Sequence, residues 1–195
     1  MQIEYEATFT NINKDEMRER LKKSGARLAT PESIRKRVNF GFPPGVSIPG
    51  GWLRLLDEDG KITLTLKIID GNKIEDQKET IIEVDDFAET ESLLSLIGCK
   101  KKAFQQSKRE GWILDGVEVD IDEWPYLEPF VEIEGKSEDE VRKVSEKLGF
   151  DYSKAIFCCV TTLYSQKYSI PEKVINFDIP LITFENPNPF EKYAQ

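Results

Sequence analysis

The sequence predicts an α+β protein in which many antiparallel strands accompany few helices. Three segments carry helix signals at both ends, and the runs between them alternate apolar with polar residues. Asp-Gly pairs at residues 59–60 and 115–116 separate neighbouring runs and are typical of tight hairpin turns. A chain of 195 residues is long enough for one well-buried core and short for two. Together these observations indicate either a curved sheet or a closed barrel.

Each predicted helix begins at a residue that can cap its first turn and ends at a glycine. The three helices span about residues 13–25, 86–98 and 137–149. A fourth apolar segment, residues 153–168, fits either a helix or a buried strand by its periodicity. Strands are expected at residues 3–10, 34–42, 52–56, 62–68, 78–84, 101–109, 111–114, 117–122 and 129–134.

Within the predicted strands, polar and charged side chains recur at every second position, as at Arg35 and Arg37 or Thr65 and Lys67. Residues two apart on a strand share a face. One face of the sheet is therefore apolar and would take the helices, while the other carries charges of both signs. On an open sheet that charged face would simply be wet. In a closed barrel it would line a tunnel suited to a polyphosphate chelated to a divalent metal.

Two Glu-x-Glu pairs lie on predicted strands near opposite ends of the chain, Glu4 with Glu6 and Glu132 with Glu134. Each pair points two carboxylates to the same side. Four converging carboxylates repel one another unless cations lie between them, and Mg²⁺ or Mn²⁺ is the hard cation that such a site would hold. Taken alone, each pair fits a solvated acidic strand face better than a metal site.

The composition excludes several classes of function. A net charge of −9 argues against a nucleic acid or an anionic membrane surface as a partner. The absence of histidine excludes His-ligated zinc and His-based triads. No apolar run reaches the roughly 20 residues of a membrane span, and the N-terminal residues lack signal-peptide character. An odd count of three cysteines indicates a reduced, cytoplasmic protein, with Cys158 and Cys159 expected in the core and Trp124 expected to pack.

Five sequence elements, in order, resemble the signature of a known superfamily. They are Glu4-x-Glu6, Trp52-Leu53-Arg54, Leu64-Thr65-Leu66-Lys67, Ser107-Lys108-Arg109-Glu110, and Asp122-Glu123-Trp124-Pro125 followed by Phe130-Val131-Glu132-Ile133-Glu134-Gly135. The pattern is similar to that of the CYTH, or triphosphate tunnel metalloenzyme, superfamily, in the form found in bacterial class IV adenylyl cyclase-like members. The resemblance covers about residues 2–168.

The resemblance implies an eight-stranded antiparallel closed β-barrel with helices packed outside. Residues 1–168 would form this tunnel domain, and residues 169–195 an extended C-terminal tail packing on it. Members of the superfamily act on triphosphates with Mg²⁺ or Mn²⁺, by cyclising ATP or by hydrolysing thiamine triphosphate or inorganic tripolyphosphate. A small-molecule triphosphate or another anionic ligand is the expected partner, and the oligomeric state stays open, a homodimer included.

Residue roles carried over from the resemblance divide the site into an acidic and a basic half. The implied metal ligands are Glu4, Glu6, Glu132 and Glu134. The implied catalytic residues are Glu4, Glu6 and Asp122, the last supporting the metal site or orienting water. The implied phosphate-binding residues are Arg54, Lys67 and Arg109, with Arg37 added from the second strand.

Three positions depart from the superfamily pattern, because Thr8, Leu56 and Ser107 stand where cations are expected. Each lost cation removes charge-assisted contacts typically worth about 1.5–3 kcal/mol. Three functions therefore stay open: a metal-dependent triphosphate enzyme, a tunnel that binds an anionic ligand without turnover, and a structural protein with an open sheet.

Overall fold

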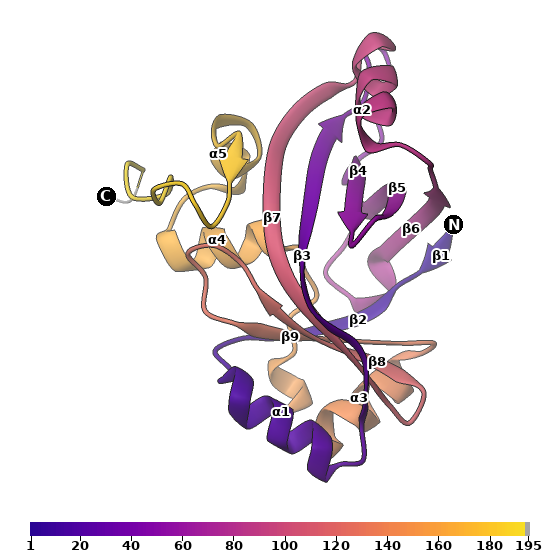
Figure 1. Ribbon diagram of the computed structural model, residues 1–195, viewed down its shortest axis with the longest axis vertical. Coiled ribbons are helices and arrows are strands. Elements are labelled where there is room, and N and C mark those ends of the chain that lie inside the picture. The colour runs from indigo at the N-terminus through magenta and orange to yellow at the C-terminus, as the bar shows by residue number, and fades with distance from the viewer. Residues whose placement is uncertain (194–195) are drawn as a thin grey trace.

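A computed structural model of the chain describes residues 1–193 and shows an α+β fold, a barrel-like sheet with helices outside it (Figure 1). The strands are β1 Gln2–Ile3, β2 Tyr5–Phe9, β3 Arg27–Gly41, β4 Gly51–Glu58, β5 Lys61–Ile69, β6 Gln77–Glu83, β7 Lys100–Leu114, β8 Val117–Glu123, β9 Phe130–Gly135 and β10 Leu181–Ile182. The α-helices are α1 Lys14–Lys23, α2 Phe87–Leu96, α3 Glu138–Lys147, α4 Val160–Tyr168 and α5 Glu172–Asp178. Two short 3₁₀ turns, η1 Ile74–Asp76 and η2 Tyr152–Lys154, complete the described elements.

The N-terminal segment closes the barrel. The sheet runs in the order β1-β6-β5-β4-β3-β7-β8-β9-β2, so its two ends are consecutive pieces of chain separated only by Glu4. On one side β1 pairs with β6, and on the other β2 pairs with β9. The break between β1 and β2 at Glu4 is the one seam in the wall. There the backbone N–H of Glu4 donates to the carbonyl of Gln77 (2.9 Å), which continues the pairing with β6 past the end of β1. Counting β1 and β2 as a single interrupted strand, eight antiparallel segments form the wall, which confirms the predicted barrel.

The two longest strands, β3 and β7, have 15 residues each and run side by side (Figure 1). The prediction began β3 at residue 34 and divided β7 at residue 110, whereas both strands are continuous over a longer span. Bulges along β3 allow it to bend while it keeps its pairing with β7. Both predicted Asp-Gly hairpins are present, with positive φ at Asp59 and Gly60 and at Asp115 and Gly116.

Helices cover the apolar outer face of the wall, as predicted. Helices α1 and α3 pack below β2, β8 and β9, where Met17, Leu21 and Val141 join a buried core (Figure 1). Helix α2 buries Leu94 against β3 and β4. The periodicity of residues 153–168 left a helix or a strand open. The segment contains helix α4 from Val160 on, and before it Ile156 forms a single antiparallel bridge with Thr8.

The C-terminal segment after α4 packs on the barrel. Strand β10 pairs in parallel with β7 at Phe104 and Gln105. These residues precede Lys108, where the pairing of β7 with β8 begins. Ile175 and Phe190 are buried in a third core with Trp124. The division into domains at residue 168 stays a prediction. Within residues 1–193, no helix is both long and apolar enough to cross a membrane.

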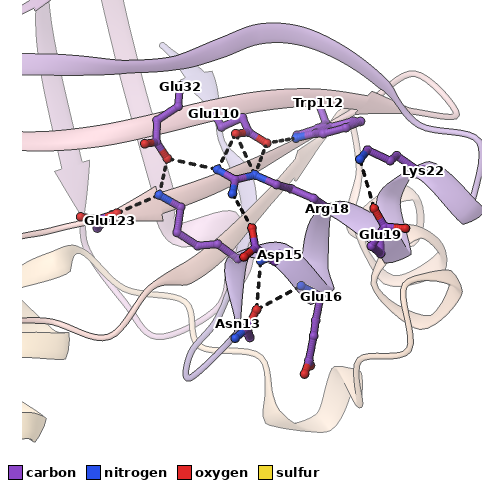
Figure 2. Close-up of polar contacts among 11 residues, drawn as sticks. Asn13, Asp15, Glu16, Arg18, Glu19, Lys22, Glu32, Glu110, Trp112 and Glu123 are labelled. Carbon is purple, nitrogen blue, oxygen red and sulfur yellow. Dashed lines mark hydrogen bonds and ion pairs between the residues drawn. The ribbon is translucent and has the colours of Figure 1, made fainter.

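Ion pairs fix α1 to the outside of the wall (Figure 2). Arg18 donates through Nε and a terminal nitrogen to the carboxylate of Glu110, the shortest contact being 2.8 Å. The same carboxylate accepts the indole N–H of Trp112 (2.8 Å). Lys14 also pairs with Glu123 (2.7 Å) and with Glu32. Because Glu110 is buried, its charge depends on Arg18 as a partner.

Replacing Arg18 with alanine should destabilise the protein by about 1–3 kcal/mol, because a buried carboxylate loses its charged donor. Lys22→Ala removes only the exposed pair with Glu19 and should change stability by less than about 0.5 kcal/mol. Urea unfolding of the two variants measures the difference. Equal losses of stability in the two variants would show that the buried Glu110 carboxylate is not stabilised by Arg18.

Candidate functional site

The polar faces of the strands meet inside the barrel and line a cavity of about 870 Å³. The wall therefore encloses the charged face, and the open-sheet alternative is wrong. The charged residues lining the cavity include Glu4, Glu6, Arg35, Arg37, Arg54, Lys67, Glu79, Arg109, Asp120, Glu132 and Glu134. These side chains form an acidic group, a basic group and a bridge between them.

Three carboxylates make up the acidic group. Glu4, Glu6 and Glu134 each offer an oxygen, and these oxygens lie within 4.8 Å of one another. The barrel closure positions them, since Glu4 lies at the seam between β1 and β2 and Glu6 is the register partner of Glu134. Burial, reinforced by the charge of Glu132, raises the pKa of Glu6 well above its ordinary value. Burial and the charge of Glu4 raise the pKa of Glu134 to about 7.

This donor set fits a hard divalent cation. It consists only of carboxylate oxygens close enough together to share one ion. Mg²⁺ and Mn²⁺ prefer such ligands, and Mg²⁺ usually keeps several waters beside a few carboxylates. Burial first, and then neighbouring carboxylates, disfavour the charged forms of Glu6 and Glu134, and a bound cation would favour them.

Glu132 is near enough to Glu6 to act on its pKa but is not one of the three carboxylates whose oxygens lie close together. Its carboxylate accepts a hydrogen bond from Arg109, which also donates to Asp122 (2.9 Å) and Asp120 (2.6 Å). Burial alone would raise the pKa of Asp122, but the charge and hydrogen bond of Arg109 lower it below its ordinary value. Burial raises the pKa of Glu132 to about 7, although Arg109 opposes the shift. Arg109, a predicted phosphate-binding residue, is therefore surrounded by three acids.

The basic group consists of Arg35 and Arg37 on β3 and Arg54 on β4. The Nε atoms of all three are buried and have no hydrogen-bond partner among the described residues. Burial, together with repulsion from Arg109, lowers the pKa of Arg35 to about 10. Burial and the neighbouring arginines lower the pKa of Arg37 well below its ordinary value. Such a group favours an anion that brings several oxygens.

Lys67 and Glu79 bridge the two groups. The Nζ atom of Lys67 pairs with Glu4 (2.8 Å) and lies 3.8 Å from Glu79. Glu79 is also 4.0 Å from Arg54. Burial and the charge of Glu4 raise the pKa of Glu79 to about 7. Carboxylates thus hold the predicted phosphate-binding lysine at the boundary between the two groups.

Arginines on β3 replace part of the positive charge that the sequence departures remove. Leu56 on β4 is the register partner of Arg37, and Ser107 on β7 is the register partner of Arg35. Strand β3 lies between β4 and β7, so Arg35 and Arg37 provide positive charge on the strand between these two positions. Thr8 on β2 is the register partner of Glu132, and Arg109 contacts the carboxylate of Glu132.

Sequence reasoning missed several residues of the cavity. Arg35 was identified only as part of a polar strand face, although it shares that face with Arg37 and the same spacing could have included it. Cys158 and Cys159 were expected in the core, but they are half-buried and line the cavity. Cys158 also packs against the core around Trp124, but the chain between η2 and α4 runs along the cavity, which no local pattern indicates. Trp124 packs as expected and also lies beneath Arg37.

In the absence of divalent cations, the protein should become more stable as the pH falls from 8 to about 5.5. The folded-state pKa values of Glu79 and Glu134 are raised to about 7, so the folded protein takes up protons that the unfolded chain does not. Glu134→Gln should reduce this gain, while exposed Glu146→Gln should leave it unchanged. Melting temperatures in EDTA test this. A melting temperature that falls over this range would contradict it.

Comparison with known proteins identifies the family. A family model of the CYTH domain matches residues 47–156. No curated protein matches the chain. Among solved structures, a conserved hypothetical protein from Pyrococcus furiosus is 21% identical, with a TM-score of 0.67 over 80% of this chain and 96% of its own.

Two solved structures described as putative cyclases share the fold. A putative adenylate cyclase from Vibrio parahaemolyticus is 12% identical, with a TM-score of 0.71 over 84% of this chain and 98% of its own. A putative adenylyl cyclase from Hippeastrum, described as having a dominant triphosphatase activity, is 13% identical, with a TM-score of 0.58 over 86% of this chain and 98% of its own. At these identities the likeness is one of fold. The family match spans more than half of the sequence, and the chain belongs to the CYTH domain family.

Proposed function

We propose that this protein is a metal-dependent enzyme that acts on a triphosphate inside its barrel. One observation carries the proposal: a single cavity holds three converging carboxylates and, beside them, buried arginines with unpaired donors. A triphosphate with a divalent cation presents charges of the opposite sign to both groups. The descriptions of the Vibrio and Hippeastrum proteins as a cyclase and a triphosphatase support the reaction class.

Glu4, Glu6 and Glu134 would hold Mg²⁺ or Mn²⁺. Bound there, the cation would neutralise charge on the phosphate oxygens and on the leaving group. The predicted role of Glu132 as a fourth ligand becomes a secondary one, because its carboxylate is engaged by Arg109. Asp122, which is fully buried beside Arg109, would orient that arginine, and a water-orienting role stays a prediction.

Arg37 and Arg54 would donate to the phosphate oxygens, joined by Arg35, which the sequence analysis left out. Lys67 would donate to the substrate while it keeps its contact with Glu4, since one ammonium has three donors. No protein nucleophile is required. In a hydrolase, water attacks the terminal phosphorus and the bond to the diphosphate oxygen breaks. In a cyclase, the ribose 3′-hydroxyl attacks the α-phosphorus and diphosphate leaves.

A binding protein without turnover is the second candidate. It is favoured by the pairing of Arg109 and Lys67 with acids, which leaves fewer cations for a tetra-anion. For either function we propose a small anionic ligand, bound in the cytoplasm at the buried arginines; the net charge of −9 argues against a nucleic acid as the partner.

Purified protein should release phosphate or diphosphate from ATP, thiamine triphosphate or tripolyphosphate, and only with Mg²⁺ or Mn²⁺. The double variant Glu4→Gln with Glu134→Gln should lose nearly all of this activity, because the cation loses two of its three proposed ligands. Exposed Glu146→Gln is the matched control and should retain full activity. Tight binding of a triphosphate without any product would favour the binding protein instead.

Glu134→Gln and Glu132→Gln should behave differently although the residues are two apart. Glu134→Gln should weaken Mg²⁺ binding about tenfold or more. Replacing a residue that merely hydrogen-bonds a metal ligand typically lowers metal affinity by at least about tenfold. The second should leave Mg²⁺ affinity largely unchanged and lower stability by about 1–3 kcal/mol, because Arg109 loses a charged acceptor. Calorimetric titration and urea unfolding measure the two effects. The reverse pattern would place Glu132 among the ligands.

A further inference from the structure

Arg37 differs from the other cavity cations in its surroundings. Arg109 contacts three acids, Lys67 contacts Glu4, and Arg35 lies 3.1 Å from Glu58. Within the described chain, no carboxylate lies within ion-pair distance of Arg37. Its guanidinium is held by two neutral groups alone.

The two neutral groups are a hydroxyl and an indole. A terminal nitrogen of Arg37 donates to the Oγ atom of Ser107 (2.6 Å). The guanidinium carbon lies 4.4 Å from the centre of the Trp124 ring, within the range of a cation–π contact. Both groups orient the guanidinium without cancelling its charge. Arg37 is 6% exposed and lines the cavity, and its buried Nε has no partner among the described residues.

An aromatic column from the C-terminal segment holds Trp124 in place. The Trp124 ring meets Tyr164 of α4 edge-on, and Tyr164 stacks on Phe190 with ring centres 4.3 Å apart. The hydroxyl of Tyr164 donates to the carbonyl of Pro125 (2.7 Å), next to Trp124. All three rings are buried. The indole therefore has little freedom to move away from the guanidinium.

We propose that Trp124 and Ser107 are positioning residues that orient Arg37 in a part of the cavity without an ion-pair partner, so that it binds a phosphoryl group of the ligand. Only the identity of that ligand rests on the proposed function. Ser107 then has a positive role: it replaces a superfamily lysine, and a lysine there would repel Arg37 instead of holding it.

The test is a double-mutant cycle on ligand binding. Inorganic tripolyphosphate with Mg²⁺ is titrated into the full chain by calorimetry. Trp124→Leu should weaken binding about tenfold, because a desolvated cation–π contact is lost. Trp124→Phe keeps an aromatic face and should lose clearly less. In an Arg37→Gln background, Trp124→Leu should weaken binding by less than a further twofold, since Trp124 acts through Arg37.

Two further variants separate positioning from folding. Ser107→Ala makes a smaller change and should weaken binding several-fold in the parent but not in the Arg37→Gln background. Phe150→Leu removes a comparable aromatic pair, the stack on Phe9 outside the cavity, and should leave affinity unchanged. Melting temperatures show whether each variant is folded.

The outcomes distinguish this inference from the enzyme proposal. Equal losses from Trp124→Leu and Ser107→Ala in both backgrounds would overturn the positioning role. Binding with the expected Arg37 dependence but without turnover would support it and remove only the enzyme proposal. No binding of tripolyphosphate, diphosphate or phosphate by the parent protein would overturn both.

Discussion

The enclosure of charges of both signs within one barrel is the constraint on which the rest of this structure depends. Carboxylates and guanidiniums taken out of water cost free energy unless opposite charges or ligands lie beside them. The barrel satisfies Arg109 with three acids of its own. It leaves the carboxylates around Glu4 and the guanidinium of Arg37 incompletely balanced. Because both lie in one cavity, a cation and a phosphate together would satisfy them.

The arrangement of the arginines gives physical meaning to the departures from the superfamily pattern. Positive charge absent at Leu56 and Ser107 reappears on β3, the strand that lies between them. Arg35 and Arg37 are two apart on one strand, share a face and both line the cavity.

The family resemblance implied the closed barrel, whereas the sequence itself predicted the strand faces because side-chain alternation is a local property of the backbone. The hairpin turns at Asp59 and Asp115 were predicted for the same reason. What it could not predict depends on distant parts of the chain meeting. Glu132 and Glu134 look equivalent in sequence, yet only Glu132 lies within reach of Arg109. Cys158 reached the cavity because the chain before α4 pairs with Thr8.

The interruption between the first two strands has one more consequence. A single residue, Glu4, joins both margins of the wall and supplies one of the clustered carboxylates. Assembly of the ligand pocket and completion of the tertiary fold are thus the same molecular event. Until the first residues of the chain pair with β6 and β9, the barrel is open and the three carboxylates are not assembled. Partly folded molecules would therefore be unable to bind a cation together with a phosphate.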